Sequence, residues 1–271
     1  MKLSNIFSRR NRVLLRELVI TDFKLRYQGS VLGYAWSLLK PLLLFAILYV
    51  VFVHFLRFGS DIEHFPVYLL LGIVLWTFFT EAANQGMQAI VARGDVIRKI
   101  NFPKYIIVIS ATLSALINLL LNLVIVVLFA LLSGVDIRFT ALLLPLNIIE
   151  LYIFALAIAF ALGALYVKYR DISHIWEVFL QGAFYATPIL YPISLVAEES
   201  VIASKLLIIL NPVAQVIQDA RYNLISHSTL TVWNYISHGL IQAIPLLIVA
   251  VSIAIAIWYF KRSQKYFAEN V

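Results

Sequence analysis

The chain has no cysteine among its 271 residues, which excludes disulfide bonds, thiol catalysis and cysteine-ligated metal sites. It also lacks the phosphate-binding pattern G-x-x-x-x-G-K-[ST], so this polypeptide is not expected to hydrolyse ATP itself. The five histidines are scattered, and none forms a pair with metal-ligand spacing. The sequence therefore predicts a chain that is not an enzyme and holds no metal or cofactor of its own.

Charge is scarce and apolar residues are abundant. Only 13% of residues are charged, whereas 62% are hydrophobic and the mean hydropathy is +0.93. A helix needs about 20 apolar residues to cross the hydrocarbon core of a bilayer. Six stretches meet that length, and they predict an all-α integral membrane protein. The predicted spans are residues 38–56, 66–91, 105–132, 141–167, 175–195 and 236–260.

The basic residues are distributed unevenly between the two sides that six spans define. Residues 1–40 carry eight Lys and Arg, 92–104 carry four, 168–174 carry two, and three follow residue 260, whereas the alternate loops carry four. Basic loops stay in the cytoplasm, so both termini are predicted to be cytoplasmic. The net charge of +7 is thereby explained without nucleic acid. We expect one membrane domain, 38–260, between a leader, 1–37, and a tail, 261–271.

Two segments are expected to be helical without crossing the membrane. Residues 9–28 are basic and place several leucines on one face, which predicts an imperfect amphipathic helix in the cytoplasmic interface or, alternatively, a solvated basic arm. Residues 188–227 contain prolines and only short apolar pieces, which predicts a re-entrant or surface-lying excursion. Backbone of that kind survives at membrane depth only when it is buried in protein or lines a wet cavity.

Polar side chains in the second span form the sharpest candidate site. Thr77, Glu81, Asn84 and Gln88 recur at helical spacing and share one face. Because an intramembrane charge is costly unless it meets a partner or water, this stripe either lines a polar conduit or holds the helices together, and the sequence leaves both open. A second stripe in the third span drifts round the helix, which favours packing. It contains Ser110, Ser114, Asn118 and Asn122.

Four stretches of the chain resemble the permease subunits of type-2 ABC transporters that export O-antigen, capsule or teichoic-acid polymers. The first is the leader with the start of the first span, D22-F-K-L-R-Y27, G29-S-V-L-G33, W36-S37 and K40-P41. The others are I100-N-F-P-K104, Y169-R-D-I172 with T187-P-I-L-Y-P192, and L210-N-P212 with A220-R221. They occur in order over nearly the whole chain.

The resemblance implies a half-transporter. Two copies would enclose a channel for a lipid-linked polysaccharide, most readily of the O-antigen type, and a separate ABC ATPase subunit would bind ATP and Mg below each copy. The stripe residues, together with Phe78 and Tyr185, would line this channel. The surrounding bilayer lipids are the remaining partners, and the bacterial cytoplasmic membrane is the expected location.

The resemblance also implies roles for three groups of residues. A coupling helix would contact the ATPase through Asp95, Val96, Ile97, Arg98, Lys99, Phe102 and Pro103. The leader residues Lys24, Arg26 and Tyr27 would attract the pyrophosphate of the substrate at its entrance. An extracytoplasmic gate would contain Pro188, Tyr191, Pro192, Asn211 and Pro212.

Two other classes of membrane protein remain open from the residues alone. A proton-coupled secondary transporter could use Glu81 as its titrating group, although such proteins often carry paired broken helices and only one segment here is interrupted. An integral-membrane transferase acting on lipid-linked sugars would need a catalytic acid–base set, whereas the carboxylates of this chain are dispersed.

Overall fold

The computed structural model describes residues 9–27, 29–55, 62–99 and 102–270, and every regular element in these ranges is a helix. The first half comprises α1 (Arg9–Tyr27), η2 (Gly33–Ala35), α2 (Trp36–Tyr49), the π-helical η3 (Val50–Phe55), α3 (Phe65–Ala92), α4 (Gly94–Lys99) and α5 (Tyr105–Leu132). The second half comprises η4 (Phe139–Leu143), α6 (Leu144–Lys168), α7 (Ile172–Ala186), α8 (Ile193–Glu199), α9 (Val201–Leu210), α10 (Pro212–Leu224), α11 (Val232–Tyr235), α12 (Gly239–Gln242), α13 (Ile244–Ser263), η5 (Gln264–Tyr266) and α14 (Phe267–Asn270).

Five helical segments of the described chain are long and apolar enough to cross a membrane. They are Gly33–Phe55, Phe65–Ala92, Tyr105–Leu132, Phe139–Lys168 and Gly239–Tyr266. These segments confirm five of the six predicted spans to within a few residues. The uncharged stretch 105–132 coincides with α5. The chain is therefore a multi-pass membrane protein.

The predicted span 175–195 is wrong in its boundaries. Its helix, α7, begins at Ile172 and ends at Ala186, and at about 1.5 Å per residue its 15 residues cover only part of a bilayer. The helix ends there because Pro188 disfavours helical backbone at the residue before it, and Thr187 is extended. The irregular residues 187–190 that follow are buried in protein, as backbone at membrane depth must be.

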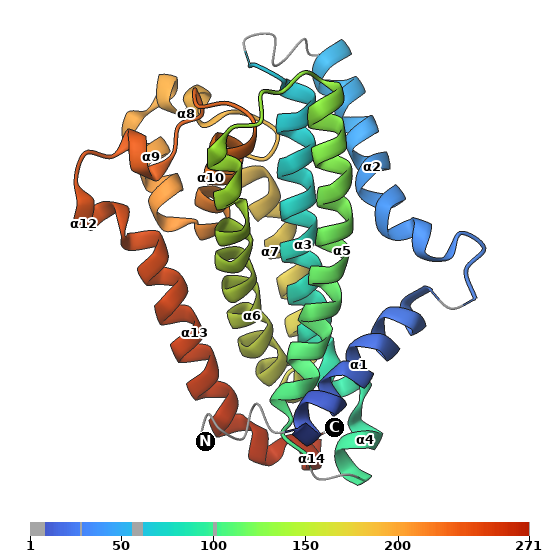
Figure 1. The fold of residues 1–271 in the computed structure, drawn as a ribbon. Helices are drawn as coiled ribbons and strands as arrows, with labels where there is room; N and C mark the ends of the chain where they lie inside the picture. The colour runs from blue at the N-terminus through green and yellow to red at the C-terminus, as the bar shows by residue number, and fades with distance from the viewer. Residues whose placement is uncertain (1–8, 28, 56–61, 100–101, 271) are drawn as a thin grey trace.

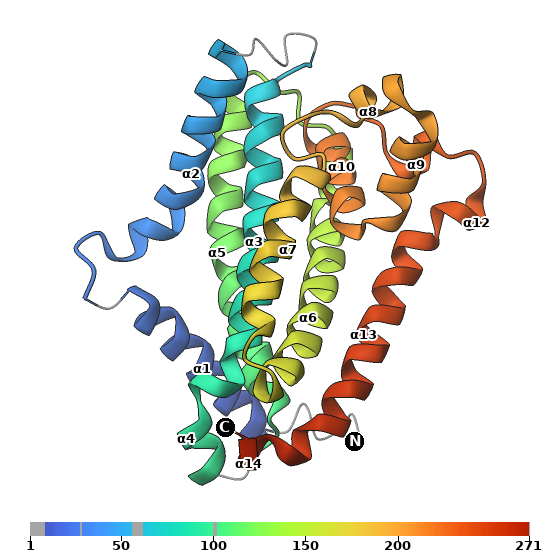
Figure 2. The same ribbon diagram turned by 180° about the vertical axis from the view of Figure 1, so that it is seen from behind.

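The long helices form one bundle, with the remaining elements at its two ends (Figure 1). The start of α1, α4 and α14 lie at the lower end, and α8 to α12 lie at the upper end in both views (Figure 2). α9 and α10 meet at an angle of 98° and both lie at the upper end, within the stretch 188–227 predicted as a re-entrant or surface-lying excursion. If this bent pair counts as one span, the described chain has six candidate crossings.

α3 lies at the centre of the bundle. In the most apolar 18-residue stretch of α3, 78% of the residues are buried. In the corresponding stretch of Gly33–Phe55, 6% are buried. Close approach to α6 requires Gly86, since a Cβ atom there would lie 2.4 Å from the Cβ of Ala159. Small residues at such a crossing let the two backbones approach and gain van der Waals contact in lipid. α3 is consequently the scaffold on which the polar sites below are built.

Candidate functional site

A polar hollow of about 470 Å³ lies between α2, α3 and α5, and we call it the α2–α3–α5 hollow. From α2 it is lined by Trp36, Ser37, Lys40 and Pro41, and from α5 by Asn118, Leu119 and Asn122. From α3 it is lined by Val74, Thr77, Phe78, Thr80, Glu81, Asn84 and Gln85. Hydroxyl, amide, carboxylate and ammonium groups thus face one space within the membrane-spanning bundle.

The hollow contains four of the six residues predicted to line a channel. Thr77, Phe78, Glu81 and Asn84 all contribute to its wall. The structure does not bring the other two to this space. Gln88 is exposed farther along α3, and Tyr185 is 69% exposed on α7.

Glu81 both lines the hollow and connects two helices. Its Oε1 atom accepts hydrogen bonds from Asn118 Nδ2 at 2.7 Å and from Gln85 Nε2 at 2.9 Å. On the next turn of α5, Asn122 Nδ2 donates to the backbone oxygen of Ser37 at 3.0 Å. The two alternatives of the sequence, conduit and packing contact, therefore apply to the same side chains.

Sequence reasoning missed several residues of the hollow. Gln85 follows Asn84 directly and lies four residues after Glu81, so helical spacing could have found it. Asn118 and Asn122 were predicted only to hold helices together, and they also line the space. Trp36 and Lys40 carried no signal of this kind, because their place depends on how α2 packs.

The residues predicted for a gate gather where α7 meets α8 and α10. Asn211 caps α10 through its Oδ1 atom, which accepts from the amides of Val213 and Ala214, and its Nδ2 atom donates to Thr187 Oγ1 at 3.0 Å. The hydroxyl of Tyr191 donates to the backbone oxygen of Tyr185 at 3.0 Å. Pro188 lies in the buried turn, and Pro192 and Pro212 stand at the starts of α8 and α10.

Arg221 of α10 fastens this region to α3. Its side chain is fully buried, and it donates to the backbone oxygens of Pro188 at 2.6 Å, Ile189 at 2.7 Å and Tyr68 at 3.2 Å. The guanidinium carbon also lies 3.4 Å from the centre of the Tyr68 ring. A Cβ atom at Gly72 would approach Arg221 Nη2 to 2.5 Å, so the glycine leaves room for the guanidinium.

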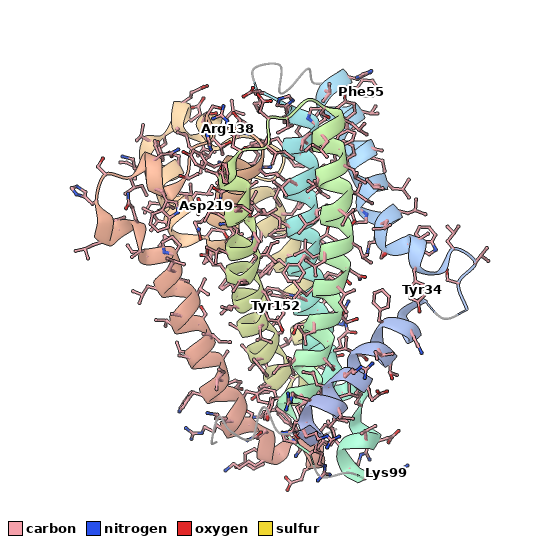
Figure 3. The ribbon with its side chains drawn as sticks, viewed as in Figure 1. Tyr34, Phe55, Lys99, Arg138, Tyr152 and Asp219 are labelled. Carbon is pink, nitrogen blue, oxygen red and sulfur yellow. The ribbon has the colours of Figure 1, made fainter. Side chains whose placement is uncertain are left out.

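The predicted coupling residues lie at the lower end, where α4 projects beyond the bundle (Figure 1). Asp95, Val96, Arg98 and Lys99 are exposed, and Figure 3 labels Lys99 at this extremity. In contrast, Ile97 and Phe102 are buried in a cluster with Phe260 and Phe267, and Pro103 is half-buried. The helix is thus anchored by its apolar side and presents its charged side outward.

An ion pair connects the first helix to the start of α4. Arg93, directly before α4, pairs with Asp22 of α1 and donates to Ser110 Oγ of α5 at 3.1 Å. Burial lowers the pKa of Arg93 from its usual range, because a desolvated guanidinium is less stable in its charged form. The Asp22 carboxylate compensates that cost, and Arg93 connects α1 and α5 to the start of α4.

α1 has the two faces expected of an interfacial helix. Leu14, Leu15 and Leu18 are half-buried, whereas the basic side chains on the other side are exposed. These exposed residues are Arg9, Arg10, Arg12, Arg16 and Lys24. Lys24 is thus accessible, as its predicted role requires. The side chains of Arg26 and Tyr27, the other two residues predicted for the substrate entrance, lie outside the described part of the structure.

The helical bundle with a polar hollow inside it defines a multi-pass membrane protein, and comparison with known proteins gives its family. The family described as "ABC-2 type transporter" matches residues 13–225 of the chain. The chain belongs to this family. It is a membrane permease domain, a transport subunit without an ATPase domain. ABC permeases work with a partner ATPase subunit.

Among curated proteins the chain is similar to O-antigen export system permease proteins named RfbA. The relative from Myxococcus xanthus is 30% identical over 264 residues, which cover 96% of this chain and 96% of the relative. Two relatives from Klebsiella pneumoniae are 30% and 29% identical over 239 residues, which cover 87% of this chain and 89% of each relative. These similarities extend over nearly the whole membrane domain.

Proposed function

We propose that this chain exports a lipid-linked polysaccharide of the O-antigen type across the bacterial cytoplasmic membrane. Two copies form the channel, and a separate ATPase subunit binds ATP and Mg beneath each copy. The observation that carries the proposal is the α2–α3–α5 hollow, because a sugar chain needs polar groups at membrane depth, where hydrocarbon offers none. The similarity to O-antigen export permeases supports the choice of substrate.

The pairing of two copies is supported by the surface of α2. This helix covers the hollow on one side, yet its outward face carries Leu43, Leu44 and Ile47 with 38–62% of their surface exposed. A second copy packed on this face would shield these apolar side chains from lipid. We place both termini and α4 on the cytoplasmic side, since the basic loops lie at that end.

The channel lining is tested by the double variant Glu81→Gln with Asn84→Leu. We expect export to fall about tenfold, because an amide replaces the carboxyl group at residue 81 and an apolar side chain replaces the amide at residue 84. Transport of lipid-linked glycan into inverted vesicles, normalised to the inserted protein, measures the effect. Gln88→Leu is the matched control, since Gln88 lies on the same helix outside the hollow. Export by the double variant at the control rate would refute the lining role.

The same vesicles separate the proposal from a proton-coupled transporter that uses Glu81. Transport through the proposed complex requires ATP and continues when an ionophore removes the proton gradient. Transport that follows the proton gradient and persists without nucleotide would instead support the secondary transporter.

A further inference from the structure

A second cavity, of about 920 Å³, lies between α6, α10, α11 and α13, away from the α2–α3–α5 hollow. Two of its walls are residues 143–153, at the end of η4 and the start of α6, and residues 246–253 of α13. The cavity therefore occupies the half of the membrane at the α8–α12 end. Leu146, Ile149 and Leu246 on these walls are 43–60% exposed. The cavity is therefore open to lipid and large enough for a small-molecule ligand.

Two carboxylates face this largely apolar space. Glu150 of α6 and Asp219 of α10 both line it, and Figure 3 labels Asp219 at the upper end of the bundle. Gln215 Nε2 bridges them, donating to Asp219 Oδ2 at 2.7 Å and to Glu150 Oε2 at 3.4 Å. The indole N–H of Trp233 donates to the same Asp219 oxygen at 2.9 Å.

The remaining oxygens of this group are buried without a hydrogen-bond donor. They are Asp219 Oδ1, Glu150 Oε1 and Gln215 Oε1. Asp219 is only 4% exposed, so water does not compensate its unpaired oxygen freely. A buried acceptor without a donor costs about 1–3 kcal/mol, and more when it is charged. These oxygens thus lack a donor, and no cationic side chain of the described lining lies beside them.

The chemistry of the lining restricts what could fill it. Among the described residues that line the cavity none is Lys, Arg or His, so a phosphate-headed or pyrophosphate-headed ligand would meet carboxylates and no cation. A primary ammonium group carries one positive charge and three N–H donors, which suit the unpaired carboxylate oxygens of Asp219 and Glu150. The apolar walls that open to the bilayer match acyl chains.

We propose that this cavity is a binding site for a phospholipid with a primary ammonium headgroup, of the phosphatidylethanolamine type. The ammonium donates to Asp219 and Glu150, and the acyl chains lie against α6 and α13. The site is separate from the polysaccharide path, and it depends only on the membrane location of the chain. A lipid bound here fills the space between α6 and α13 at the level of α10.

Trp233 provides the test, because it lines the cavity and its indole contacts Asp219. The full-length chain is reconstituted with brominated phosphatidylethanolamine or brominated phosphatidylcholine in a phosphatidylglycerol background. The Trp233 signal is the difference between wild type and Trp233→Phe. We expect half-maximal quenching of this signal at an about tenfold lower fraction of the ethanolamine lipid, since the choline nitrogen has no N–H to donate.

The double variant Glu150→Gln with Asp219→Asn should quench equally with both lipids. Glu177→Gln with Asp136→Asn is the matched control, because it removes two exposed carboxylates and should keep the preference. If the first variant fails to insert, the wild-type comparison still decides. Equal quenching of wild type by both headgroups overturns the proposal. A headgroup preference that survives in the double variant also overturns it. Thermal stabilisation by Na⁺ or K⁺ without headgroup preference overturns it too, because that result would identify a cation site.

Discussion

Replacing Arg98 and Lys99 of α4 together by glutamate should weaken binding of the ATPase subunit by about 100-fold, since like charges at an interface cost several kcal/mol. Both side chains are exposed at the extremity of the bundle. Ile97, on the side of α4 that faces the bundle, is buried. The reversal therefore changes the outward face and leaves the anchoring contact intact. Co-purification of the ATPase with the tagged permease measures binding, and glycan transport in vesicles should fall in parallel.

The matched control reverses the same number of charges at the same end of the molecule. Lys261 and Arg262 of α13 are also exposed there, and Lys261→Glu with Arg262→Glu should leave ATPase binding within about threefold of wild type. An equal loss in both double variants would mean that the general charge of this end, and not α4, attracts the partner. Full binding and export in the α4 variant would refute the coupling role outright.

The second large effect is expected at Arg221. Replacing it by methionine keeps a long side chain but leaves the oxygens of Pro188, Ile189 and Tyr68 without this donor. We expect the free energy of unfolding to fall by on the order of 3 kcal/mol, the cost of several buried acceptors left unpaired. Loss of folded protein on heating in detergent, followed by size-exclusion chromatography, measures the change.

A second arginine at the same end serves as the reference. Arg138, labelled in Figure 3, is exposed and contacts His227, so Arg138→Met should change stability by no more than about 0.5 kcal/mol. Arg221→Lys should be intermediate, because an ammonium carries the charge but cannot hold the planar fork of donors. Unchanged stability of Arg221→Met would show that water replaces the guanidinium and that the region is not fastened by it.

The spans could be read from the sequence wherever apolar length alone determines a helix. α5 coincides with the predicted stretch because 28 uncharged residues can hardly do anything else in lipid. α7 was predicted too long because the apolar run continues past Pro188, and hydropathy does not register the backbone donor that proline lacks. The re-entrant excursion was predicted from its prolines and short pieces, yet the 98° angle between α9 and α10 could not be.

The candidate sites were predictable only along single helices. The spacing of Thr77, Glu81 and Asn84 identified one wall of the α2–α3–α5 hollow, since that wall belongs to one helix. Lys40 reaches the same space from a helix whose orientation depends on tertiary packing. Arg221 appeared in the sequence as part of a family-like pair, Ala220-Arg221, but its backbone acceptors lie 32 or more residues away along the chain.

The burial of α3 restricts how this protein can move. A helix that packs against neighbours on most sides cannot shift without breaking many contacts, so α3 is suited to stay in place during transport. Within one copy, Gly33–Phe55 and Gly239–Tyr266 have only 6% and 17% of their most apolar stretches buried, so fewer of their contacts must break when they move. We therefore expect a transport cycle to displace these two outer segments relative to α3.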